Sequence, residues 1–205
     1  MSKTTIFPPI GIAGAALVGK DTLCSAIIYQ FNCNFNLKAK RCSIAGDTIR
    51  KDLKEMIFNK INVYIDMENP KIKKNIQPLM VEYGRCMRNH TKGRYFIDIL
   101  NKNKEFGRNY IPIIPDMRYS EYENDEVYWL KVEKKGLLIF LEREGIEPAN
   151  KYEEKNNKIL KKAADFILKV PTVLNTEDYF LKTDTEIEKI ITTYRRDIFR
   201  PSNKS

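Results

Sequence analysis

The chain has 205 residues, with 36 lysines and arginines against 27 aspartates and glutamates, and a formal net charge of +9. This length can bury the core of one domain, and a hydrophobic content of 42% excludes a disordered chain. No apolar run approaches the roughly 18 residues that a membrane helix needs. The basic excess suits an anionic partner, and nucleic acid, acidic membrane and nucleotide phosphates all stay open on charge alone.

The cysteines and the N-terminal segment bear on the compartment. The four cysteines form no Cys-x-x-Cys pair, and His90 is the single histidine, so a zinc site is not expected. Pro8 and Pro9 interrupt the N-terminal segment, which lacks the apolar core of a signal peptide. We therefore expect reduced thiols, a cytoplasmic location and no membrane partner.

Short apolar runs alternate with longer amphipathic stretches, which predicts an α/β fold. Asp47 is expected to cap a helix, Pro78 to kink one, and Pro112 fits a central strand poorly. The expected strands span 10–13, 41–45, 110–114, 137–141 and 166–168. The expected helices span 20–31, 47–57, 72–88, 95–103, 121–134, 153–162 and 185–199, before a frayed tail over 200–205.

The most informative segment is Gly-Ala-Ala-Leu-Val-Gly-Lys-Asp-Thr over residues 14–22. It follows a predicted strand and opens a predicted helix, which is the context that a phosphate-binding loop requires. Its glycines allow successive backbone N–H groups to point at phosphate oxygens, and the helix N-terminus adds its positive dipole end. We expect ATP to be bound by Gly14, Ala15, Ala16, Val18, Gly19, Lys20, Asp21 and Thr22.

One position of this loop departs from the usual pattern. Asp21 stands where a serine or threonine normally holds magnesium, and Thr22 comes one residue later. A carboxylate can also hold Mg²⁺, and Asp116 is a further candidate, so the expected metal ligands are Asp21, Thr22 and Asp116. The Asn-Lys-x-Asp motif of guanine-specific switches is absent, which favours a small kinase.

Several blocks, in order, carry a family resemblance. They are Gly19-Lys20-Asp21-Thr22, the helix end over 77–85, Pro115-Asp116-Met117-Arg118-Tyr119, the strand over 136–142 and Ala164-Asp165-Phe166. With them the sequence resembles the deoxynucleoside monophosphate kinases of bacteriophages and related viruses, within the nucleoside monophosphate kinase group. That family usually has Asn-Glu soon after the third block. Here Ser120-Glu121-Tyr122-Glu123 follows, and which glutamate corresponds stays open.

The resemblance implies a fold and a division of the chain. The fold would be an α/β P-loop kinase three-layer sandwich, with a central, mostly parallel five-stranded sheet flanked by helices. One domain would span 1–205, with an acceptor-binding helical region over about 47–108 and a short lid over about 142–162. The implied activity is ATP- and Mg²⁺-dependent transfer of a phosphoryl group to a (deoxy)nucleoside monophosphate, which gives the diphosphate for DNA precursor synthesis.

Phosphoryl transfer needs positioning and charge neutralisation rather than covalent chemistry by the protein. Arg118 follows a parallel strand at the end where α/β sheets bind ligands, Asp116 points to the same side, and Arg143 follows another strand where the lid would start. The expected catalytic residues are Lys20, Asp21, Arg118 and Arg143. The expected acceptor-binding residues are Arg50, Gln77, Arg85, Arg88, Asp116, Arg118 and Glu121.

Two alternative functions stay open. A kinase for another acceptor, such as a nucleoside, a phosphometabolite or a polynucleotide 5′-end, keeps the same donor chemistry. A non-enzymatic nucleic-acid-binding protein would explain the charge, although lysines and glutamates are interleaved along the chain, which disfavours it. The sequence does not decide the accepted base, deoxyribose against ribose, or whether the chain forms a homodimer. Its abundant Lys, Asn and Ile suggest an AT-rich genome, and a viral enzyme would act in the host cytoplasm.

Overall fold

A parallel β-sheet forms the centre of the protein in the computed structural model, which describes residues 5–67, 69–172 and 176–199. Within these residues the sheet has five strands in the order β2-β3-β1-β4-β5, and every neighbouring pair is parallel. The strands are β1 (Ile10–Ala13), β2 (Ala39–Arg41), β3 (Ile111–Ile114), β4 (Leu137–Arg143) and β5 (Phe166–Val170). The predicted α/β class with a central five-stranded sheet is confirmed.

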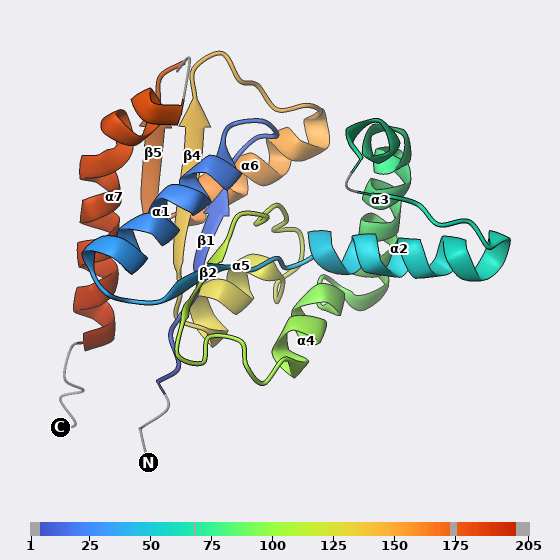
Figure 1. Cartoon of the computed structure of the whole chain (residues 1–205), viewed down its shortest axis with the longest axis horizontal. Coiled ribbons are helices and arrows are strands. Elements are labelled where there is room, and N and C mark those ends of the chain that lie inside the picture. Colours follow the sequence, from blue (N-terminus) through green and yellow to red (C-terminus); the bar gives the residue numbers. More distant parts are fainter. Residues whose placement is uncertain (1–4, 68, 173–175, 200–205) are drawn as a thin grey trace.

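Helices cover both faces of this sheet (Figure 1). They are α1 (Lys20–Asn34), α2 (Gly46–Ile61), α3 (Pro70–Thr91), α4 (Tyr95–Lys102), α5 (Glu126–Tyr128), the π-helical turn η1 (Trp129–Glu133), α6 (Lys151–Ala163) and α7 (Thr176–Phe199). No helix of the described ranges is both long and apolar enough to cross a membrane. Helix α2 and the start of α3, which lie between β2 and β3 in the chain, project away from the sheet (Figure 1).

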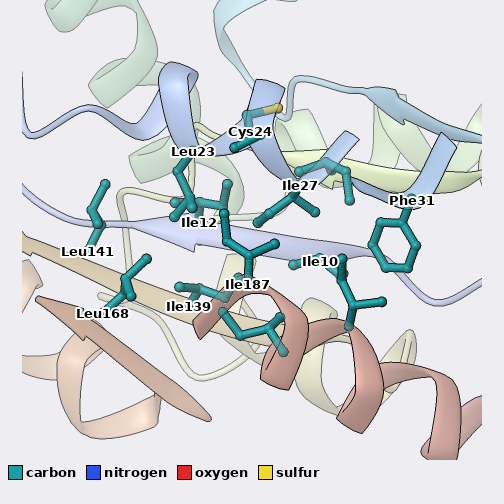
Figure 2. Packing of buried hydrophobic residues seen from close by; sticks show 14 of the residues in the cluster. Ile10, Ile12, Leu23, Cys24, Ile27, Phe31, Ile139, Leu141, Leu168 and Ile187 are labelled. Atoms are coloured by element: carbon teal, nitrogen blue, oxygen red, sulfur yellow. The ribbon is translucent and has the colours of Figure 1, made fainter. Parts of the chain in front are cut away.

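Two hydrophobic cores, one on each face of the sheet, make three layers. On one face, α1 and α7 pack on the strands through residues such as Ile27 and Ile187 (Figure 2). On the other face, α4, η1 and α6 contribute Phe96, Trp129 and Leu160 among others. Consecutive residues of β4 alternate between the two cores, as the two-residue period of a strand requires. Strands buried on both faces explain the continuous apolar runs in the sequence.

The second strand and the helix after it are displaced from their predicted positions. The strand expected over 41–45 ends at Arg41, because the backbone N–H groups of residues 44–46 donate to the Asp116 carboxylate instead of extending the ladder. Helix α2 begins at Gly46, so Asp47 lies inside its first turn and is not the cap. The backbone N–H of Asp47 donates to the Ser43 hydroxyl at 3.2 Å, which supplies the capping acceptor.

The helix expected over 121–134 begins five residues late, at Glu126, because the Asp125 side chain caps it by accepting from the backbone N–H of Val127. Helix α7 begins at Thr176 rather than at 185, and α3 runs continuously through Pro78. Pro112 lies in β3 between two strands, and the pairing of β3 with β1 begins at the residue that follows it. The predicted tail over 200–205 lies outside the described residues.

Candidate functional site

The loop between β1 and α1 lies at the carboxyl end of a central strand, where α/β sheets bind ligands. Gly14 has a φ of 137° and Gly19 a φ of 105°, both in the region that favours glycine. A Cβ atom on Gly14 would lie 2.4 Å from the backbone oxygen of Leu141, closer than real Cβ contacts. Leu17 also has a positive φ, of 63°. The tight turn therefore depends on the two glycines that the sequence pattern singled out.

Lys20 begins α1 and folds back over the loop. Its Nζ donates to the backbone oxygens of Gly14 at 2.7 Å and Ala15 at 2.6 Å, and the residue is only 7% exposed. Burial, together with the positive charge of Arg118, lowers the pKa of the Lys20 ammonium to about 8. The ammonium group therefore sits at the mouth of the loop, with Arg118 close enough for the two charges to interact.

Asp21 and Thr22 lie in the first turn of α1, beside Lys20. The Asp21 carboxylate is exposed, and its nearest cation is Arg41, with 3.5 Å between Nε and Oδ1. Within the described residues no three His, Cys, Asp or Glu side chains group together as metal ligands. One exposed carboxylate next to a phosphate loop fits Mg²⁺, which proteins hold by one or two carboxylates together with substrate phosphates and waters.

A cleft of about 420 Å³ opens beside Lys20, between α1, the helices α2 and α3, and the segment that follows β3. Six cationic side chains line it against the two carboxylates of Asp21 and Asp116. The six are Lys20, Arg41, Arg50, Lys74, Arg88 and Arg118. Gln77 lines it too, next to the apolar side chains of Met80 and Val81. The cleft is thus strongly basic near the loop and partly apolar along α3.

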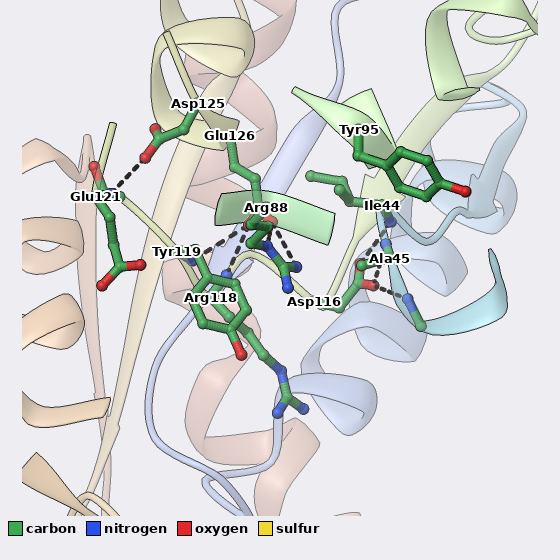
Figure 3. A network of polar contacts seen from close by, with 12 residues as sticks. Ile44, Ala45, Arg88, Tyr95, Asp116, Arg118, Tyr119, Glu121, Asp125 and Glu126 are labelled. Carbon is green, nitrogen blue, oxygen red and sulfur yellow. Dashed lines mark hydrogen bonds and ion pairs between the residues drawn. The ribbon is translucent and has the colours of Figure 1, made fainter. Parts of the chain in front are cut away.

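The Asp116 carboxylate is committed to the N-terminus of α2 (Figure 3). It accepts hydrogen bonds from the backbone N–H groups of Ile44 at 3.0 Å, Ala45 at 3.2 Å and Gly46 at 3.1 Å, and from the Ser43 hydroxyl at 2.6 Å. A carboxylate is favoured here because these N–H groups lie at the positive end of the helix dipole. Asp116 therefore fixes the wall of the cleft that α2 forms.

Arg88 lies behind the cleft in a buried ion pair. Its guanidinium donates to Oε1 of Glu126 from Nε at 3.2 Å and from Nη2 at 2.9 Å. The other carboxylate oxygen of Glu126 accepts from the backbone N–H groups of Arg118 at 3.1 Å and Tyr119 at 3.3 Å. Glu126 therefore holds the backbone that carries Arg118, while the Arg118 side chain extends away from it (Figure 3).

Arg118 was predicted from the sequence as a site residue, whereas Glu126 was not. Within the described part of the chain the Arg118 guanidinium makes no hydrogen bond or ion pair, so its donors remain available on the cleft. Glu126 was not among the predicted site residues. The expected helix start at residue 121 put it inside a surface helix, whereas in the structure it is the first residue of α5 and only 1% exposed. An N-cap aspartate followed by a glutamate, soon after Arg118, was the available signal.

Three of the predicted catalytic and acceptor-binding residues do not line this cleft. Arg85 is exposed and pairs with Glu82 at 2.7 Å. Glu121 accepts hydrogen bonds from the Tyr152 hydroxyl and, at 3.5 Å, from the amide of Asn156, both on α6. Arg143 ends β4 and lines a second cavity on the other side of the phosphate loop.

This second cavity has a volume of about 1060 Å³. Ala15 and Val18 of the loop line it, together with the ends of β4 and β5, the segment 144–148 and α6. Residues 142–162, predicted as a lid, therefore border this cavity, and the phosphate loop contributes residues to both hollows. Two hollows that meet at one loop can hold two ligands close to each other, and such proximity favours a reaction between them.

Comparisons with known proteins add little to this geometry. No protein-family model matches the chain, and no curated protein sequence matches it significantly. Among solved structures, the chain is similar to a dephospho-CoA kinase from Campylobacter jejuni. The two share 18% sequence identity and a TM-score of 0.38, over 90% of this chain and 95% of the other. At that score the function must be argued from the residues of this chain.

Proposed function

We propose that this protein is an ATP- and Mg²⁺-dependent kinase that transfers the γ-phosphoryl group of ATP to a (deoxy)nucleoside monophosphate. The observation that carries the proposal is the cleft that Lys20 and Arg118 share. The buried ammonium at the loop and the available guanidinium after β3 face one hollow. Two fixed cations between donor and acceptor phosphates would neutralise the charge that develops during transfer.

The donor phosphates would lie in the loop over residues 14–22, against its backbone N–H groups and Lys20. Asp21 would hold Mg²⁺, with Thr22 beside it, while Asp116 keeps the role of fixing α2. Bound Mg²⁺ supplies neutralisation of the donor phosphate oxygens. The donor nucleoside would occupy the larger cavity, where Arg143 and the segment 142–162 border the loop and would exclude water as a lid.

The cleft favours an acceptor phosphate over an acceptor hydroxyl. A hydroxyl needs a general base, whereas a monophosphate brings an ionised oxygen as the nucleophile. Of the two carboxylates that line the cleft, Asp116 is engaged with the N-terminus of α2, and Asp21 is the proposed Mg²⁺ ligand, so neither is left to act as a base. The apolar side chains along α3, with Gln77 among them, suit a base whose edge the amide can read.

The proposal is tested by measuring ATP consumption with each deoxyribo- and ribonucleoside monophosphate in turn. We expect turnover with at least one of them, and Lys20→Ala should abolish it while the far-UV circular dichroism spectrum stays unchanged. Lys155→Ala, an exposed lysine of α6 that lines neither cavity, is the matched control and should retain activity. Full activity of Lys20→Ala would contradict the assignment of the loop.

A second candidate keeps the donor chemistry and changes the acceptor. Its support is that the basic cleft also suits a phosphometabolite or a polynucleotide 5′-end that carries its own phosphate. If no nucleoside monophosphate is phosphorylated, the same assay with these acceptors decides between them. If ATP is consumed only with a 5′-phosphorylated oligonucleotide, for example, the acceptor is a polynucleotide and not a nucleotide.

A further inference from the structure

Glu153 places a carboxylate inside the phosphate loop. It lies in the first turn of α6, and its Oε1 accepts a hydrogen bond from the backbone N–H of Ala16 at 2.9 Å, across 137 positions of sequence. Its other oxygen accepts from the backbone N–H of Ala149 at 2.7 Å. The side chain is half-buried, so solvent screens this contact only in part. A negative group from α6 therefore occupies an N–H group in the middle of the loop.

This contact uses the chemistry by which such loops bind phosphate. Loop N–H groups recognise an oxygen that carries negative charge, and a carboxylate oxygen satisfies the same donor as a phosphate oxygen. One N–H group cannot serve both well, and the two like charges repel at close range. The Glu153 charge also reaches Lys20, whose pKa it raises against the lowering effect of burial. The carboxylate is thus placed to compete with a donor phosphate.

The same turn of α6 is tied to the acceptor side. The Asn156 side chain accepts from the backbone N–H of Ser120 at 2.9 Å, and the Tyr152 hydroxyl donates to Glu121. The ring of Tyr152 lies 5.9 Å from that of Tyr119, which lines the acceptor cleft. Helix α6 therefore contacts the phosphate loop at one residue and the segment after β3 at two others.

We propose that Glu153 is an internal gate of the phosphate loop, displaced from the Ala16 N–H by a donor phosphate. This inference rests on the proposed function, because it requires a polyphosphate donor to bind the loop. Displacement breaks the tie between the loop and α6, so donor binding releases the first turn of the helix that borders the larger cavity. The gate lowers affinity for the donor and couples its arrival to the position of the lid.

The test is calorimetric titration of wild type, Glu153→Gln and Glu186→Gln with ATP–Mg²⁺ and with inorganic triphosphate. Glu153→Gln should bind both ligands about tenfold more tightly, a change of about 1.4 kcal/mol. We expect equal gains in affinity for the two ligands because the carboxylate competes with phosphate and not with the nucleotide base. Glu186→Gln is the matched control: it removes the same charge from an exposed turn of α7, where the side chain contacts Lys189 outside both cavities, and should bind as wild type does.

The outcomes separate the two proposals. If wild type binds ATP and Glu153→Gln binds no more tightly, the gate is wrong and the phosphate loop stands. If Glu186→Gln gains as much as Glu153→Gln, the effect comes from net charge and the gate is again wrong. If none of the three proteins binds either ligand, the proposed function fails, and the gate with it.

Discussion

Replacing Arg88 with methionine would leave the Glu126 carboxylate buried without its cation. The two side chains are 5% and 2% exposed, and two guanidinium hydrogen bonds join them. Breaking a buried ion pair at one partner typically destabilises a protein by about 3–5 kcal/mol. The Arg88 guanidinium also stacks on Tyr119, with 3.7 Å between its Cζ and the ring centroid. We expect the free energy of unfolding to fall by about 4 kcal/mol at neutral pH, the middle of that range.

The stability that Arg88→Met loses should depend on pH in a defined direction. Burial raises the pKa of Glu126, and Arg88 opposes that rise, so the pKa must climb further once Arg88 is removed. The folded variant then binds the carboxyl proton more tightly than the unfolded chain does. The variant keeps its stability below the pKa that Glu126 has in the unfolded chain. It loses stability as the pH rises through the pKa that Glu126 has in the folded variant. The deficit against wild type should therefore be small in acid and grow toward neutral pH.

Urea unfolding followed by circular dichroism, at several pH values, measures this deficit. The control is Arg88→Met with Glu126→Gln, because replacing both charges by neutral groups of similar size is often nearly neutral for stability. We expect the double variant to recover most of the loss. A double variant as unstable as Arg88→Met alone, or a deficit that does not change with pH, would refute the reasoning. Packing of the arginine would then explain the loss.

Three further outcomes follow from the site. Gly14→Ala should destabilise the fold by about 1–3 kcal/mol in urea unfolding, since φ is 137° and its Cβ would meet the Leu141 oxygen; unchanged stability would mean the loop relaxes. Arg118→Ala should lower kcat/KM for the acceptor about 100-fold in steady-state assays, whereas Arg85→Ala, outside the cleft, should not. With the pKa of Lys20 near 8, kcat/KM for ATP should fall as the pH rises above about 8, because the ammonium loses its proton; a flat profile to pH 10 would contradict this.

The local features of this protein could be predicted from its sequence. A segment of about a dozen residues specifies a strand, a tight loop and the start of a helix. Its signals are an apolar run, then glycine at residues 14 and 19, and a lysine at 20. The continuous apolar run over 137–141 likewise indicated a strand buried on both faces. Such features depend on backbone conformation and periodicity, which neighbouring residues decide.

The contacts that complete the site join residues far apart in the chain, so no local pattern predicted them. The Asp116 carboxylate ends β2 early by drawing in residues 72 positions away, and Glu126 reaches Arg88 across 38. From the sequence, Asp116 was predicted at the metal and the acceptor, and Arg88 at the acceptor. Only the packed structure shows which partner each charged side chain has, because a buried carboxylate accepts hydrogen bonds from whichever donors the fold brings to it.

The sequence by itself therefore determined the α/β class, the glycine-dependent loop between β1 and α1, and the cations available to it. The tertiary structure decided which cations reach the cleft, leaving Arg118 on it and Arg85 outside. It also decided that Glu153 meets the loop, although 137 positions separate it from Ala16. One physical reason explains why the sequence did not predict the positions of these cations or the contact of Glu153. Charge and backbone conformation are properties of a residue and its neighbours, whereas the partner of a charge is set by the packing of whole helices on the sheet.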